Sequence, residues 1–166
     1  MNKTKNKKDK WIKLICGASN EDIVAIEDLC AIYTAAGVDY IDVAAEESIV
    51  HAAKKGIDWA KKLFKNSPGL MISISDGNDI HFRKAKFDPL KCPPLCPRPC
   101  EKICPTFAID NFGVNESKCY GCGRCLNSCP LNLISEYEYN LSKDDLASKL
   151  QKIKPNAVEI HTDINR

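Results

Sequence analysis

Eight of the ten cysteines in this 166-residue chain lie between Cys92 and Cys129, and this clustering constrains the fold more than any other feature. Disulfide bonds do not persist in a reducing compartment, so such an excess of cysteine is typical of metal or cluster ligation. The sequence contains nothing like a signal peptide or a membrane span, because its apolar runs are short and interrupted by charge. We therefore expect a cytoplasmic protein that binds metal through thiolates.

The later four cysteines form a segment that we call the second arm, Cys119-Tyr-Gly-Cys122-Gly-Arg-Cys125-Leu-Asn-Ser-Cys129-Pro. Its spacing, C-x2-C-x2-C-x3-C-P, is that of bacterial-type ferredoxins, in which the fourth cysteine ligates the other of two clusters. Three thiolates spaced in this way on a tight loop can reach three corners of one cubane. The two glycines between them let backbone N–H groups approach the sulfur atoms.

The earlier four cysteines form the first arm, Cys92-x3-Cys96-x3-Cys100-x3-Cys104-Pro105. Only its final C-x3-C-P matches the ferredoxin run, since each earlier gap holds one residue more. Prolines in these gaps stiffen the loop and make it extended. The extra residues can bulge outward without moving the ligands far, so the first arm is expected to bind a cluster as well.

Cross-ligation between the arms predicts two sites, both expected to hold [4Fe–4S] clusters. The ligands of the first are Cys92, Cys96, Cys100 and Cys129, and those of the second are Cys119, Cys122, Cys125 and Cys104. Two structural zinc sites are the alternative, although zinc ligands usually come as separated C-x2-C pairs. A [3Fe–4S] centre in the first arm, or one first-arm cysteine that is not a ligand, is a further alternative.

The two remaining cysteines lie at apolar positions, Cys16 in a predicted strand and Cys30 on the apolar face of a predicted helix. Free cysteine commonly behaves as a small core residue. Neither has a partner at ligand spacing, so we interpret both as packing residues.

The segments around the cysteines alternate between strand and helix periodicity. Strands are predicted at 11–16, 38–43, 70–75 and 157–161. Helices are predicted from Ser19 or Asn20 to Gly37, over 46–65 with a break or kink near Gly56, and from Ser142 or Asp144 to Lys152. Alternation of this kind implies right-handed crossovers and a parallel sheet. The predicted fold class is α/β, a partial (β/α) barrel-like parallel sheet of about four strands with an inserted two-cluster ferredoxin-like α+β module.

This interpretation divides the chain into four segments. Residues 1–10, with five lysines against one aspartate, form a disordered basic tail to which we assign no nucleic-acid or membrane contact. Residues 11–77 hold the first βα units, residues 78–140 the cluster module, and residues 141–166 the last helix and strand. A short hairpin around Asn111-Phe112-Gly113 is expected to bring the two arms face to face.

A carboxylate and histidine site is a second hypothesis, because Asp42, Asp76, Glu159 and His161 fall at or near the ends of predicted strands. Carboxylates at such positions are also routine helix caps and turn formers. The chain has no nucleophile elbow, phosphate loop or nucleotide fingerprint, and four strands cannot complete a barrel mouth. We therefore assign no catalytic residue, and a redox sensor or electron carrier is favoured over an enzyme.

Four stretches together resemble the cyanobacterial light-dependent period protein family (LdpA): IKLICGASNEDIVAIEDLCAIYTAAGVDYIDVAA, DGNDIHFRKAKFDP, CPPLCPRPCEKICP and CYGCGRCLNSCP. The resemblance covers most of residues 11–162, and family members usually continue into a C-terminal region that this chain lacks. It implies an iron–sulfur protein that senses a redox state set by photosynthetic electron flow and passes it to the circadian clock. Its expected partners are a redox protein and clock input proteins. The alternative is an electron-transfer subunit or domain of an oxidoreductase.

Overall fold

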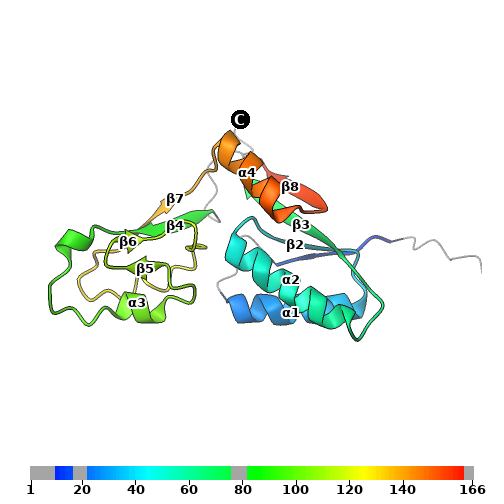
Figure 1. Cartoon of the computed structure of the whole chain (residues 1–166), viewed down its shortest axis with the longest axis horizontal. Coiled ribbons are helices and arrows are strands. Elements are labelled where there is room, and N and C mark those ends of the chain that lie inside the picture. Colours follow the sequence, from blue (N-terminus) through cyan, green and yellow to red (C-terminus); the bar gives the residue numbers. More distant parts are fainter. Residues whose placement is uncertain (1–9, 17–21, 76–81, 163–166) are drawn as a thin grey trace, which may run out of the picture.

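The computed structural model describes residues 10–16, 22–75 and 82–162, which form a sheet-and-helix unit and a cysteine-rich module (Figure 1). The unit contains a four-stranded parallel sheet. Its strands, in spatial order, are β1 (Lys13–Ile15), β2 (Tyr40–Ala44), β3 (Gly69–Ser75) and β8 (Ala157–His161). Along the chain, each strand of this sheet pairs with the strand that precedes it in the sheet, as in a barrel. The predicted α/β class and parallel sheet are confirmed, and we call this part the α/β unit.

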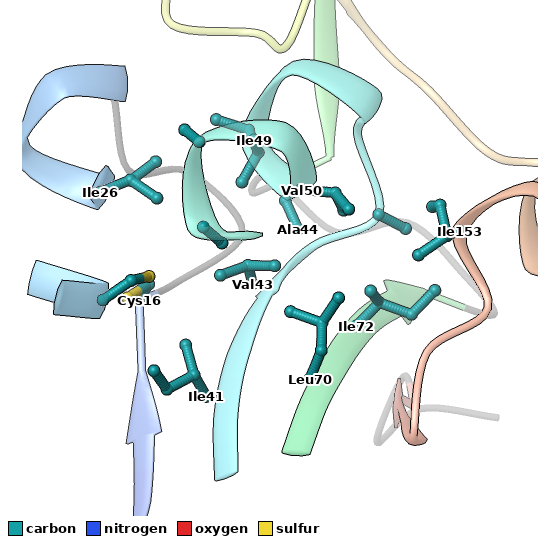
Figure 2. Packing of buried hydrophobic residues seen from close by; sticks show 14 of the residues in the cluster. Cys16, Ile26, Ile41, Val43, Ala44, Ile49, Val50, Leu70, Ile72 and Ile153 are labelled. Carbon is teal, nitrogen blue, oxygen red and sulfur yellow. The ribbon is translucent and has the colours of Figure 1, made fainter. Parts of the chain in front are cut away.

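Three helices supply the apolar cover of this sheet: α1 (Ile23–Ala36), α2 (Glu47–Lys61) and α4 (Lys143–Ile153). Figure 2 shows Ile26, Ile49 and Ile153 from these helices around Val43 and Ile72 of the central strands. All five side chains are almost completely buried. Apolar side chains alternate along the strands and recur at helical spacing on the helices, and this pattern produces one continuous core.

Two details of the helices differ from the sequence prediction. Asp22 caps α1 by accepting from the backbone N–H groups of Val24 and Ala25, whereas the predicted caps, Ser19 and Asn20, lie outside the described residues. The predicted break at Gly56 is wrong, since α2 is continuous there. A Cβ at Gly56 would come within 2.1 Å of the Glu27 carbonyl oxygen, so the glycine allows α1 and α2 to pack closely.

The sheet is strongly curved. The Lys13 ammonium on edge strand β1 pairs with the Glu159 carboxylate on β8, the opposite edge of the sheet. In a flat sheet three strand spacings would separate these edges by about 14 Å. A direct ion pair between side chains on the two edge strands therefore indicates the curvature of a partial barrel.

The module enters and leaves through an antiparallel pair that the sequence did not predict, β4 (Arg83–Lys86) with β7 (Ser135–Glu138). Between them lie a short 3-10 turn η1 (Pro89–Lys91), the helix α3 (Pro99–Ile103) and the strands β5 (Ile109–Asp110) and β6 (Gly113–Val114). The strands β5 and β6 pair antiparallel, which confirms the predicted hairpin. No helix in the described part of the chain is long and apolar enough to span a membrane.

Candidate iron–sulfur site

Three of the four second-arm cysteines share a pocket with the last cysteine of the first arm. Its cysteine lining is Cys104, Cys119, Cys122 and Cys125, and its other walls are largely apolar, among them Ala108, Ile109 and Val114. Burial, together with the neighbouring thiols of Cys119 and Cys122, raises the pKa of Cys125 to about 12. These four thiols are the predicted ligands of the second cluster.

The other four thiols, those of Cys92, Cys96, Cys100 and Cys129, also come from both arms. Cys92 hydrogen-bonds with Cys96 and lies near Cys100, and Cys100 in turn lies near Cys129 of the second arm. The structure thus places Cys104 beside three second-arm cysteines and Cys129 near Cys100 of the first arm. Ligation itself stays a prediction.

Both arms end in the same backbone turn. After Cys104-Pro105, Phe107 adopts a left-handed conformation and the N–H of Ala108 lies 3.2 Å from the Cys104 sulfur. After Cys129-Pro130, Asn132 adopts the same conformation and the N–H of Leu133 lies 3.4 Å from the Cys129 sulfur. The repeated turn fixes each fourth thiol and directs an N–H donor at it.

Backbone donors also affect how readily these thiols ionise. Burial alone would raise the pKa of Cys129, but N–H groups of the turn, led by that of Leu133, hold it below its ordinary value. Burial raises the pKa of Cys100 and outweighs the opposing effect of a backbone N–H at Glu101. Metal binding requires thiolates and releases their protons, so the buried thiols are expected to ionise on cluster binding.

The chemistry of these groups fits iron–sulfur clusters. Each offers four sulfur donors, and the groups have N–H donors near sulfur and apolar walls, the features that hold and tune such clusters. Within the described residues no three histidine, cysteine or acidic side chains converge closely enough to hold a single metal ion. Gly121 must be glycine, because its φ is +83° and a Cβ would come within 2.2 Å of the Arg83 carbonyl oxygen.

Lys84 is a site residue that sequence reasoning missed. It lies on β4, its exposed fraction is only 2%, and its ammonium donates to the carbonyl oxygens of Glu116 at 2.5 Å and Cys119 at 2.6 Å. The same ammonium lies 3.2 Å from the carboxylate of Glu46, which immediately precedes α2. A lysine is rarely buried unless it is paired, so the sequence alone gave no reason to select this one among many.

Tyr120 joins the second arm to the α/β unit. Its side chain belongs to the core of that unit, and the neighbouring Cys122 packs against the same core. Burial and the adjacent Cys122 raise the pKa of the Tyr120 hydroxyl. The second arm is therefore held against the α/β unit by an apolar contact at Tyr120 and an ionic contact at Lys84.

Cys16 and Cys30 lie in the core of the α/β unit. Their side chains are 6% and 0% exposed and hydrogen-bond to each other. This hydrogen bond lowers the pKa of Cys16 and raises that of Cys30. Both residues occupy packing positions of the kind that the sequence predicted.

The proposed carboxylate and histidine positions form a polar cluster on the inner face of the sheet. Asp42 lies within β2, where it accepts from Ser73 at 2.7 Å and pairs with Lys13 at 3.4 Å, so its interpretation as a cap or turn former is wrong. Burial raises the pKa of Asp42. Glu159 pairs with Lys13, while His161 at the end of β8 lies edge-on to another ring. Asp76 lies outside the described residues.

Comparisons with known proteins support iron–sulfur binding. The LdpA Fe-S cluster-binding domain family matches residues 92–140. Over 155 residues, 93% of this chain, the sequence is 47% identical to Light dependent period A of Synechococcus elongatus, but those residues span only 44% of that relative. This chain therefore spans less than half the length of that protein.

Two other relatives match shorter segments. The arsenate respiratory reductase iron-sulfur subunit ArrB of a Shewanella species is 39% identical over 57 residues, 31% of this chain and 24% of that protein. The putative oxidoreductase UacF of Escherichia coli is 29% identical over 77 residues, 44% of this chain and 12% of that protein. No solved structure matches the chain.

Proposed function

This chain belongs to the LdpA family, and we propose that it is a redox sensor that binds two [4Fe–4S] clusters and reports the state of photosynthetic electron transport to the circadian clock. The match to the family's cluster-binding domain identifies the chain as an iron–sulfur protein. The clock role is carried over from the name of the S. elongatus relative, Light dependent period A. A cytoplasmic location goes with this proposal, since free thiols and their clusters need a reducing compartment.

The observation that carries the two-cluster proposal is the grouping of the eight thiols. Cys104 shares a pocket with three second-arm cysteines, and Cys129 lies near Cys100 of the first arm. An exchange of the fourth ligand is the pattern of two-cluster ferredoxins. Each cluster would supply a one-electron couple, while the chain's own residues hold it, shield it and direct N–H groups toward its sulfur ligands.

The proposal is tested on protein purified without oxygen. We expect a brown protein with eight iron and eight inorganic sulfide per chain on the [4Fe–4S] stoichiometry, and two reducible EPR signals. Colourless protein that carries stoichiometric zinc and no sulfide would overturn the cluster proposal. Sensing is tested separately, by asking whether purified clock input proteins bind the oxidised and the reduced chain with different affinities.

The second candidate is an electron-transfer subunit or domain of an oxidoreductase. It is supported by the 39% identity with the iron-sulfur subunit ArrB, although this similarity covers only 31% of the chain. Under this proposal the module would pass electrons to an enzyme partner and the α/β unit would bind that partner. Co-purification of a stoichiometric enzyme subunit that reduces or oxidises the clusters would favour it over the sensor.

A further inference from the structure

Lys84 makes direct contacts with both parts of the molecule. Its ammonium donates to the backbone carbonyls of Glu116 and Cys119 in the module, and it pairs with Glu46 beside α2 in the α/β unit. The ring of Tyr139 lies 4.5 Å away and covers the same ammonium. An ammonium has three donors, and the three acceptors here satisfy all of them.

Burying the Lys84 ammonium is unfavourable unless all of its donors and its charge have partners. Removing an ammonium from water costs several kcal/mol unless charge and hydrogen-bond partners replace the lost hydration. Glu46 provides the charge, and it also pairs with Lys149 of α4 at 3.3 Å. The ion pair of the buried Lys84 and the partly exposed Glu46 therefore links the second arm to two helices of the α/β unit.

We propose that Lys84 is a positioning residue for the second-arm cluster: it fixes the backbone at Cys119 and places a positive charge beside the cluster, which Glu46 partly neutralises. The inference rests on the proposed function, because it assumes that Cys119 is a ligand. A cluster held by four thiolates is anionic and becomes more so on reduction, so a nearby fixed cation favours the reduced form. Glu46 acts in the opposite direction.

The first arm has a different electrostatic environment. Arg98 lies in its loop, but the guanidinium pairs with Glu101 of the same arm at 3.0 Å and also donates to the hairpin turn at Asn111. Neither contact reaches the α/β unit. Lys84 instead contacts the Cys119 carbonyl, so the effect of the Lys84–Glu46 pair is expected mainly at the second-arm cluster.

The test measures the midpoint potential of each cluster by EPR-monitored redox titration of the holoprotein purified without oxygen. We expect Lys84→Met to shift the second-arm potential to more negative values and Glu46→Gln to shift it to more positive values. The first-arm potential should not move in either variant. The second-arm signal is identified as the one that Cys122→Ser perturbs.

Matched controls lie next to both residues. Lys86 is an exposed lysine on the same strand, and Glu47 is the next carboxylate, paired at the surface with Lys152 at 2.6 Å. Lys86→Met and Glu47→Gln should leave both potentials unchanged. Shifts in these controls as large as those at Lys84 and Glu46 would attribute the effect to overall charge and overturn the inference.

Opposite shifts distinguish an electrostatic role from a purely structural one. If the two residues had only a structural role, both variants would shift the second-arm potential in the same direction, or would lose iron without a change in potential. Either result would overturn the inference. If Lys84→Met does not fold, the Glu46→Gln variant tests the inference alone. An unchanged midpoint potential of the second-arm cluster in Glu46→Gln would overturn the inference. A wild-type chain without iron and sulfide would instead show that the proposed function itself is wrong.

Discussion

The α/β unit and the module differ in what holds them together. The core of the α/β unit consists mainly of isoleucine, valine and alanine side chains, and Ile26, Ile41 and Ile72 in it are completely buried. The module's core is small and rich in cysteine: Cys100 and Cys125 are buried in it, and Cys104, Cys119 and Cys129 pack against it. A segment of this size with so little apolar core usually needs a metal or disulfides to fold. Packing therefore stabilises one region, and ligation is expected to stabilise the other.

The two arms differ in a related way. The first arm and its neighbours expose large apolar side chains, with Leu90, Leu95 and Phe112 all more than 90% exposed. The second arm lies against the α/β unit through Tyr120 and Lys84. One cluster would therefore be open to an electron donor, while the other would lie next to the α/β unit.

The largest expected effect comes from removing the iron. Extraction with ferricyanide and a chelator should unfold the module and leave the α/β unit folded, because only the module depends on ligation. Hydrogen exchange should then become fast at β5, β6 and α3 and stay slow at β2 and β3. Both tryptophans, Trp11 and Trp59, lie in the α/β unit, so their fluorescence should be nearly unchanged. Equal loss of protection in both regions would show a single cooperative unit.

Loss of one cluster is the next largest effect, and it tests the exchange of ligands. Cys129→Ser should perturb the same EPR signal as Cys96→Ser, although Cys129 follows Cys125 in the second arm. Cys122→Ser should perturb the other signal. The proximity of Cys129 to Cys100 is the physical reason. If Cys129→Ser and Cys122→Ser altered one signal together and spared that of Cys96→Ser, each arm would hold its own cluster.

The features that the sequence predicted well depend on local pattern. Strand β8 has the predicted bounds, 157–161, and Ser142 caps α4 as expected. The hairpin around Phe112 and the four parallel strands also follow from periodicity and turn residues. Each of these depends on neighbours in the chain, which a sequence displays directly.

The features that the sequence missed depend on contacts between distant residues. A glycine inside a helical pattern predicts a break in the helix. Gly56 instead leaves room for the Glu27 carbonyl on another helix. The pairing of β4 with β7 joins segments separated by both arms. Lys84 and Asp42 are charged residues whose burial depends on partners elsewhere in the fold. None of these partners could be assigned from spacing.

Gly56→Ala should destabilise the α/β unit and leave the iron content of the folded protein unchanged. The added Cβ would meet the Glu27 carbonyl, so α1 and α2 must separate, at a cost of about 1–3 kcal/mol in the free energy of unfolding. Tryptophan fluorescence in urea measures this change. His51→Ala, at an exposed position of the same helix, is the control and should cost under about 0.5 kcal/mol. Similar values for the two variants would contradict the close-packing explanation.

Cys30→Ala should cost roughly 1 kcal/mol in the α/β unit, since it leaves a small cavity and removes the hydrogen bond to Cys16. Cys16→Ala should have a similar effect. Neither change should alter iron or sulfide content, because neither thiol belongs to the two ligand groups. Iron loss in either variant would show that the ligand assignment is wrong and that the two regions share a metal site.

The smallest expected effect concerns the ion pair that joins the two edges of the curved sheet. The pKa of Glu159 is held below its ordinary value by its hydrogen bond to Lys13, so at pH 7 Glu159 is ionised and contributes stability that is lost only as the pH falls through this lowered pKa. Both side chains are partly exposed, so Glu159→Gln should cost about 0.5 kcal/mol in the α/β unit at pH 7 and low salt. High salt screens exposed pairs, so the difference from the wild type should shrink there. A difference that persists in high salt would show that the Glu159 side chain contributes mainly through packing rather than through its charge.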